Sequence, residues 1–233
     1  MLQDEYRNLY KKIRTGWNDS VSIYKDLVSK NITKDTVVLE AGCGFSSLFE
    51  KEYKRARRVI GVDISRKFLD LNKLLNTKIV SDLGSMPKVK DNSIDVIISS
   101  WVLEHLKKPA KVFSEFRRVL KTGGRVVFIT PNNLNYVVFL NKLVPEAVRK
   151  FIVGRMAENL VTDPMKTYYK INSVEKIRRL AKRSGLELKK VILNGDPTYV
   201  AINKPFFHLG VLIEALTPKP FRVHIIGILK KNE

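Results

Sequence analysis

Four positions in the first third of the chain have the residue types and spacing that bind a ligand with a cationic end and a ribose. Glu40 stands just before Gly42-Cys43-Gly44, and Asp63 ends the next apolar run. Glycines let the backbone approach a ligand closely, a carboxylate favours a cation, and an acid about 20 residues further on suits a ribose diol. A dinucleotide is disfavoured, because Glu40 would repel a diphosphate and Ser47 replaces the last glycine of that fingerprint.

These residues need strands that end beside one another, and the sequence predicts such strands. Short, apolar, β-branched runs predict buried strands at 37–39, 59–62, 78–81, 94–98 and 125–130, and two more at 186–193 and 222–229. Helical spacing of apolar residues predicts helices within 1–34, with a break at Gly16, and over 47–53, 66–76, 109–120, 173–184 and 205–216. Asp82-Leu83 follow the third strand and Ser99-Ser100 end the fourth, so both pairs belong at the same edge as Glu40 and Asp63.

Residues 36–132 resemble the class I S-adenosylmethionine-dependent methyltransferases, in the branch that includes ubiquinone and menaquinone methyltransferases. The resemblance rests on the glycine turn with its two acids, on Met86-Pro87, on Leu103-Glu104-His105 and on the Lys-x-Gly-Gly turn at 121–124, all in the order of the family. Ser46 departs from the family, because most relatives have a third glycine there.

The resemblance implies a fold, a cofactor and a set of binding residues. The fold would be a Rossmann-like α/β sheet of seven mostly parallel strands with helices on both faces, an antiparallel last strand and a helical insertion after the fifth strand. The cofactor would be S-adenosylmethionine. Its binding residues would be Glu40, Gly42, Cys43, Gly44, Asp63, Ile64, Asp82, Leu83 and Ser100.

The methyl acceptor site offers two candidate catalytic residues. His105 is the best candidate base because the ordinary pKa of imidazole lies near neutrality, and Tyr168 is a second candidate on a segment expected to return to the cleft. Tyr169, Glu104 and His208 are weaker candidates, and Leu-Glu-His in this family is also often structural. No metal site is expected, because the three histidines are scattered and lack ligand spacing.

The length of 233 residues suits one domain, 1–233, and the single cysteine excludes a disulfide framework. We expect N-terminal helices in 1–35, a cofactor-binding core in 36–132, a helical lid in 133–171, and a C-terminal helix and strands in 172–233. The start shows no signal peptide and no stretch is apolar enough to span a membrane, which indicates a cytoplasmic protein.

The net charge of +20 leaves the partner open. It favours an anionic partner, either nucleic acid or a membrane surface, but it also fits a solvated lysine-rich surface. Residues 134–156 mix apolar residues with cations, and residues 205–216 add an apolar helix. We therefore expect a small-molecule or lipid- or glycan-linked acceptor and peripheral contact with an anionic membrane. A lid or a dimer contact are the alternatives for these segments.

An RNA methyltransferase, or a basic binding protein that retains the fold, is the alternative function. Ser99-Ser100-Trp101-Val102 argues against methylation of base nitrogens.

Overall fold

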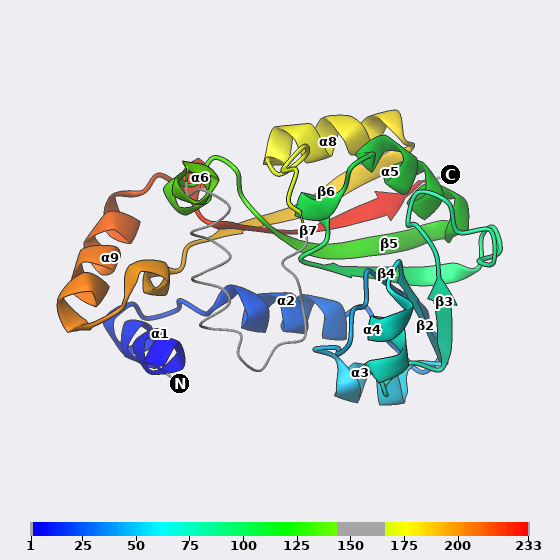
Figure 1. Cartoon of the computed structure of the whole chain (residues 1–233), viewed down its shortest axis with the longest axis horizontal. Coiled ribbons are helices and arrows are strands. Elements are labelled where there is room, and N and C mark those ends of the chain that lie inside the picture. The colour runs from blue at the N-terminus through cyan, green and yellow to red at the C-terminus, as the bar shows by residue number, and fades with distance from the viewer. Residues whose placement is uncertain (1, 144–165, 233) are drawn as a thin grey trace.

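The computed structural model describes residues 2–143 and 166–232, and its centre is one seven-stranded sheet (Figure 1). β7 runs antiparallel to both of its neighbours, and the other pairings are parallel, as predicted. In spatial order the strands are β3 (Thr77–Val80), β2 (Arg58–Asp63), β1 (Val37–Ala41), β4 (Ile94–Ser100), β5 (Leu120–Pro131), β7 (His224–Lys231) and β6 (Leu186–Asn194).

Helices cover both faces of the sheet because the central strands are apolar on both faces. Val38 of β1 packs against α2 (Ser20–Ser29) and the residues around α3 (Glu50–Arg55). Leu39, its neighbour on β1, faces the opposite layer, which contains α5 (Pro109–Val119) and α8 (Val174–Arg183). Figure 1 shows α5 and α8 on one side of the sheet and α2 and α3 on the other.

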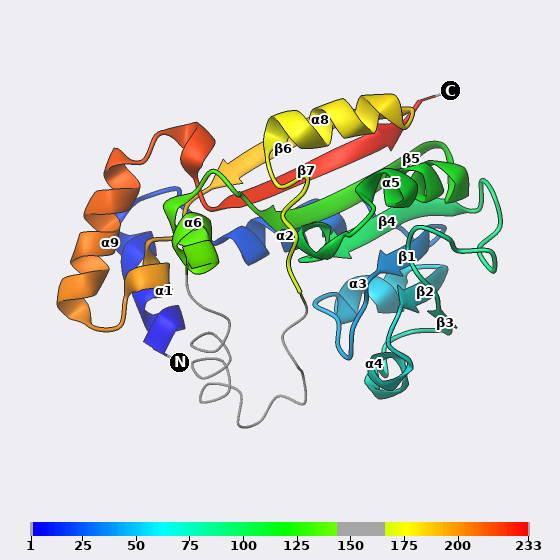
Figure 2. The same cartoon turned by 45° about the horizontal axis from the view of Figure 1, so that its top comes forward.

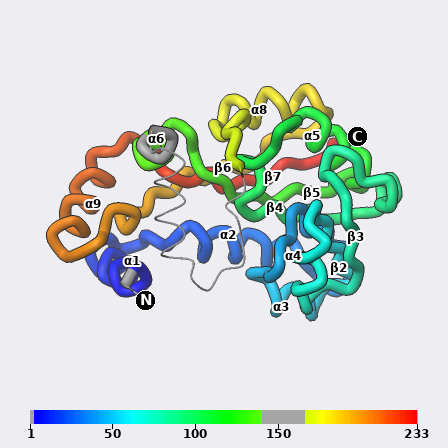
Figure 3. Tube along the Cα trace, viewed as in Figure 1, coloured from blue at the N-terminus to red at the C-terminus, as the bar shows by residue number. Residues whose placement is uncertain are grey.

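Most predicted helices form where the sequence places them. α1 (Leu2–Ile13) and α2 are separated at Gly16, which has a φ of +82°. Ser173 caps α8 by accepting a hydrogen bond from the Lys176 amide, and α9 (Lys204–Leu216) matches the predicted apolar helix. Figure 3 shows how α1 comes to lie beside α9 despite their distance in sequence, and the stacked rings of Tyr6 and Phe207 join them.

Three larger differences from the predicted boundaries stand out. α4 (Arg66–Leu71) stops five residues early, because Asn72 turns extended and its side-chain amide donates to the carbonyls of Cys43 and Gly44, both at 3.4 Å. The helix predicted from Ser47 begins only at Glu50. The predicted turn at 121–124 is part of β5, whose pairing with β4 shifts register there.

The parallel strands all end at one edge of the sheet, and further elements gather beyond it (Figure 2). They are α1, α6 (Tyr136–Leu143), α9 and three short 3-10 helices, η1 (Leu103–His105), η2 (Pro197–Val200) and η3 (Lys219–Phe221). Much of the lid predicted over 133–171 lies outside the described residues. Within the described part of the chain, no helix combines the length and apolar character needed to cross a membrane.

Candidate functional site

The glycine turn after β1 is tied to the end of β2. Gly42 and Gly44 have φ values of +67° and +55°, the left-handed region that favours glycine. The Gly42 amide donates to the Val62 carbonyl at 2.8 Å, and the Gly44 amide donates to Asp63 Oδ2 at 2.9 Å. Cys43 between them is buried, which raises the pKa of its thiol. The thiol therefore packs in the core and is not reactive.

Asp63 and Asp82 are held at the ends of neighbouring strands. Asp63 Oδ1 accepts a second amide hydrogen bond, from Ser65 at 2.8 Å, so two backbone donors fix the orientation of this carboxylate. Asp82 follows β3 and accepts from the Gly84 amide at 2.6 Å. Strand ends and short turns thus hold both acids in place.

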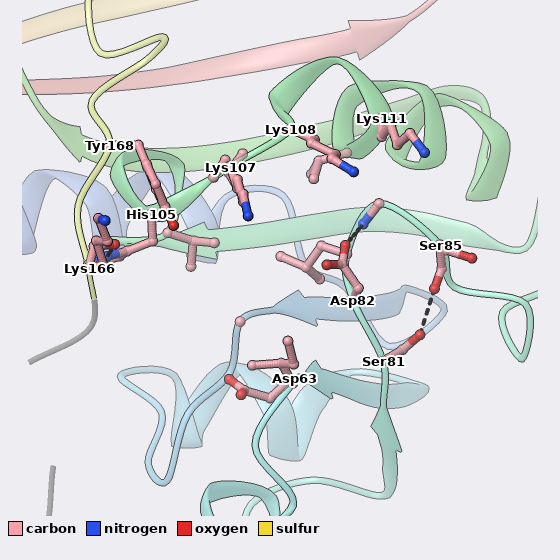
Figure 4. Close-up of a pocket in the computed structure, with 17 residues that line it drawn as sticks. Asp63, Ser81, Asp82, Ser85, His105, Lys107, Lys108, Lys111, Lys166 and Tyr168 are labelled. Atoms are coloured by element: carbon pink, nitrogen blue, oxygen red, sulfur yellow. Dashed lines mark hydrogen bonds between the residues drawn. The ribbon is translucent and has the colours of Figure 1, made fainter. Parts of the chain in front are cut away.

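A cavity of about 540 Å³ joins these acids to both candidate catalytic side chains (Figure 4). Figure 4 shows Asp63 and Asp82 on one side, with His105, Tyr168 and Lys166 together at the other. The predicted site residues that line it are Gly42, Asp63, Ile64, Asp82, Leu83, His105 and Tyr168. The cavity's volume of about 540 Å³ lies within the range of small-molecule binding sites.

Four of the predicted binding residues, Glu40, Cys43, Gly44 and Ser100, do not line this cavity. Glu40 points toward the α2 and α3 layer, where Ser47 Oγ donates to its Oε1 at 3.0 Å. Its other oxygen, Oε2, is buried, and although the Tyr53 hydroxyl is a neighbour of the carboxyl group, no described residue makes a hydrogen bond of good geometry to Oε2. Burial raises the pKa of Glu40 to about 8. Ser100 Oγ instead shares a hydrogen bond of 3.1 Å with the hydroxyl of Tyr24.

The Leu-Glu-His segment divides into a structural and an accessible part. Glu104 is buried: its Oε2 accepts from Thr130 Oγ1 at 2.9 Å, and its carbonyl accepts from the amides of Tyr168 and Tyr169 at 2.7 and 3.1 Å. His105 faces the cavity, and its Nδ1 lies 3.0 Å from the Lys166 carbonyl. Glu104 therefore holds residues 168–169 in place next to His105. The catalytic roles of His105 and Tyr168 stay predictions.

Two further groups of residues lie near the site, and of these only Tyr169 was named from the sequence as a candidate. Lys107, Lys108 and Lys111 line the cavity, but they belong to a chain that is rich in lysine everywhere. A second cavity of about 230 Å³ is lined by Trp101, Pro131, Val137, Val138, Tyr169, Tyr199 and Val223.

The wall between the two cavities comes from adjacent residues. Trp101 and Tyr169 line the small cavity, and their chain neighbours Val102 and Tyr168 line the large one. Trp101 has a φ of +57°, a rare conformation for a bulky residue that is most often retained at functional sites.

A buried polar chain supports the small cavity from behind. The Tyr199 hydroxyl lies 2.8 Å from His224 Nε2, and His224 Nδ1 lies 2.8 Å from Ser20 Oγ. Burial lowers the pKa of His224 to about 4, so the imidazole is neutral at pH 7. Among the described residues, no group of histidines, cysteines and acids is arranged to hold a metal ion.

Comparisons with known proteins identify what the chain is similar to. Residues 39–128 match the family model for a methyltransferase domain. The chain is 33% identical over 128 residues to a thiol S-methyltransferase of Rattus norvegicus, covering 51% of each protein. It is 25% identical over 162 residues to a ubiquinone biosynthesis O-methyltransferase of Nitrosococcus oceani, covering 66% of this chain and 64% of that enzyme. The first curated relatives are matched over about half of their length.

Solved structures show the same fold. A geranyl diphosphate C-methyltransferase of Streptomyces coelicolor, solved with S-adenosyl-L-homocysteine, has a TM-score of 0.60 at 15% identity, covering 91% of this chain and 80% of that one. An S-adenosylmethionine-dependent methyltransferase of Mesorhizobium loti has a TM-score of 0.57 at 16% identity, covering 89% and 97%. Residues 39–128 thus match a methyltransferase domain, and the chain has the fold of S-adenosylmethionine-dependent methyltransferases.

The residues of this methyltransferase domain fit its cofactor, S-adenosylmethionine. Asp63 presents a fixed carboxylate at the cavity wall, as a ribose diol requires. The apolar side chains of Ile64 and Leu83 flank Asp63 and Asp82, where an aromatic ring would lie. The unpartnered oxygen of Glu40 beneath the turn would complement a cationic group.

Proposed function

We propose that the protein transfers a methyl group from S-adenosylmethionine to a small-molecule or lipid- or glycan-linked acceptor, at oxygen or, alternatively, at carbon or nitrogen. The observation that carries this proposal is the single cavity with Asp63 and Asp82 at one end and His105 and Tyr168 at the other. Cofactor and acceptor must meet in one enclosed space for in-line displacement, because that reaction depends mainly on positioning.

When bound, S-adenosylmethionine supplies an electrophilic methyl group on a sulfonium. Asp63 and Asp82 hold the nucleoside part away from the acceptor end. His105 takes the proton of an acceptor hydroxyl, and its ring is oriented by the contact of Nδ1 with the Lys166 carbonyl. Tyr168, fixed through its amide on Glu104, closes the same end of the cavity and orients the acceptor.

The experiment uses the full chain in two steps. Calorimetry first measures binding of S-adenosylmethionine and S-adenosyl-L-homocysteine. Cell-extract fractions are then incubated with the protein and methyl-labelled cofactor, and the labelled product is identified. We expect transfer to a small or lipid-extractable product. Cofactor binding without transfer to any fraction would contradict the proposal.

Two variants assign the roles at the acceptor end. His105→Asn should lower the turnover number about 10²- to 10⁴-fold, the usual contribution of a general base, and leave cofactor affinity unchanged. Tyr168→Phe should act mainly on the acceptor KM. Equal turnover in wild type and His105→Asn would remove the histidine from the reaction.

Nucleic acid is the second candidate acceptor, and two basic hollows beside α8 favour it. One, about 470 Å³, includes Arg117, Arg118 and Lys231, and the other, about 330 Å³, includes Lys176 and Arg179; they share Arg183. Such a series of cations binds a phosphate backbone with strong salt dependence. Filter binding of labelled RNA at rising salt concentration, with the double variant Arg179→Gln and Arg183→Gln, tests it.

A further inference from the structure

α9 presents a stripe of large apolar side chains to solvent. Phe206, Leu209, Leu212 and Leu216 are 44, 47, 56 and 74% exposed. Their spacing of three to four residues places them along one side of the helix. Ile202, just before the helix, and Phe221, just after it, are also exposed. Contiguous apolar patches on otherwise soluble folds mark interaction surfaces.

The opposite side of the same helix is firmly packed, so the exposed stripe is a fixed feature of the fold. Phe207 is fully buried and stacks on Tyr6 with ring centres 4.9 Å apart. Gly210 lies against η2 so closely that a Cβ would come within 2.4 Å of the Pro197 carbonyl. Glu214 is buried, with Arg222 at 3.6 Å. These contacts orient the stripe away from the protein.

Figures 1 and 2 both show α9 at the outer end of the molecule, beyond the edge where the parallel strands end. Its ends carry cations: Lys204 begins the helix and Lys219 follows it, and both are exposed. Between residues 197 and 223 the sequence contains one acid, the buried Glu214. The surface therefore combines apolar side chains with uncompensated positive charge.

We propose that α9 docks the protein on an anionic lipid bilayer, with the stripe in the boundary between headgroups and acyl chains. An interfacial helix needs this combination of an apolar face and flanking cations. A second copy of the chain is disfavoured, because a two-fold contact would bring the lysines of each copy against those of the other, in a protein with a net charge of +20.

Docking by α9 orients the methyltransferase domain toward the membrane. η2 packs directly on α9 and carries Tyr199, which lines the small cavity beside Trp101. Bilayer contact at α9 therefore brings the side of the domain that carries the small cavity toward lipid. The proposal goes beyond the proposed function, and vesicle binding is measured without acceptor, so failure of one leaves the other unaffected.

The experiment is co-flotation of the full chain with vesicles of phosphatidylcholine alone or with about one third phosphatidylglycerol. We expect binding to the anionic vesicles that falls as salt rises. Leu212→Ser should lower the partition coefficient about tenfold. Serine lacks most of the free energy that a leucine side chain gains on transfer from water into lipid. Lys204→Gln and Lys219→Gln should each lower it about fivefold.

Matched controls distinguish the effect of the α9 stripe from the general effect of exposed apolar and charged side chains. Leu71, on α4 at the far end of the molecule, is 51% exposed and resembles Leu212 at 56%. Leu71→Ser should leave vesicle binding within a factor of two, as should the exposed lysine variant Lys51→Gln. Circular dichroism verifies that every variant is folded.

Three outcomes would overturn the proposal. The first is absence of flotation with anionic vesicles at low salt. The second is equal loss of binding in Leu71→Ser and Leu212→Ser. The third is a dimer in sedimentation velocity that Leu212→Ser dissociates, together with no vesicle binding, which would assign the stripe to a second copy.

Discussion

The cofactor side and the outer side of this molecule are built from contacts of very different sequence range. Beside the cavity, the Gly44 amide reaches Asp63 across 19 residues, and Ser65 reaches the same carboxylate across two. At the outer end, Arg7 binds Asp196 across 189 residues, and His224 meets Ser20 across 204. A local motif can specify the first region, whereas the second exists only once the whole chain has folded.

The largest expected effect of a substitution is on the glycine turn. Gly42→Val forces a branched residue into a positive φ and puts its Cβ about 2.7 Å from Val102 Cγ2. We expect loss of S-adenosylmethionine binding by more than about a thousandfold, because the turn and the cavity wall must both move. Calorimetry measures it, and circular dichroism verifies the fold.

Two further tests distinguish the backbone strain of a positive φ from the steric clash with Val102. Gly44 also has a positive φ, but a Cβ there would meet nothing within 4 Å, so Gly44→Ala should cost only the backbone strain, about 1 kcal/mol of stability. The pair Gly42→Ala with Val102→Ala should bind better than Gly42→Ala alone. Equal affinities in the single and double variants would show that Val102 is not the obstacle.

Asp63→Ala should weaken S-adenosylmethionine binding about tenfold to a few hundredfold. Charge-assisted hydrogen bonds contribute roughly 1.5–3 kcal/mol each, and the variant also frees the amides of Gly44 and Ser65. Asp63→Asn, which keeps one oxygen acceptor, should lose less. Unchanged calorimetric affinity in a folded Asp63→Ala protein would remove this residue from the cofactor site.

Glu40 should make cofactor binding pH-dependent. Its pKa of about 8 means that the free protein holds a proton there at pH 7, and a bound cation would lower that pKa. Binding should therefore release up to one proton and tighten by at most about tenfold per pH unit between pH 6 and 8, levelling off above. Calorimetry in buffers of different ionisation enthalpy measures the proton, and Glu40→Gln should abolish its release.

The same carboxyl should affect stability in the opposite direction. The folded-state pKa lies above the ordinary value of 4.5, so the unfolded chain releases a proton that the folded chain retains. The free energy of unfolding should accordingly fall as pH rises from about 4.5 to about 8. Urea denaturation of Glu40→Gln should lack this part of the decline. An identical pH profile in wild type and variant would mean that Glu40 is already ionised.

The sequence was sufficient for the strands, for most helices and for the places of Asp63 and Asp82 at strand ends, because each depends on residues close in the chain. Ser173 before α8 and Asp63 after β2 are examples of such local signals. Asn72 was missed because its role, holding the glycine turn, requires a contact across 29 residues inside a stretch that otherwise looks helical. Trp101 and Tyr199 were missed for the same reason, since their cavity needs the last strand and η2 in place.

Tyr199→Phe is expected to have the smallest effect on cofactor binding. It also tests whether the outer end of the molecule is independent of the cofactor side. The variant leaves His224 Nε2 without its partner in a buried place, which should lower the free energy of unfolding by about 1–3 kcal/mol. S-adenosylmethionine affinity should stay within a factor of two, because among the described residues no hydrogen bond or ring contact links Tyr199 to Asp63 or Asp82.

Ser20→Ala gives the matched second variant, because Ser20 contacts the other nitrogen of the same neutral imidazole. In a neutral imidazole one nitrogen donates and the other accepts, so the partner on one side sets the role available on the other. Urea denaturation of both single variants and the double variant should therefore show non-additive losses, with a coupling of about 0.5 kcal/mol or more. Additive losses would mean that the two contacts act separately. A large fall in cofactor affinity in Tyr199→Phe would instead show that the outer end of the molecule and the cofactor site are energetically coupled.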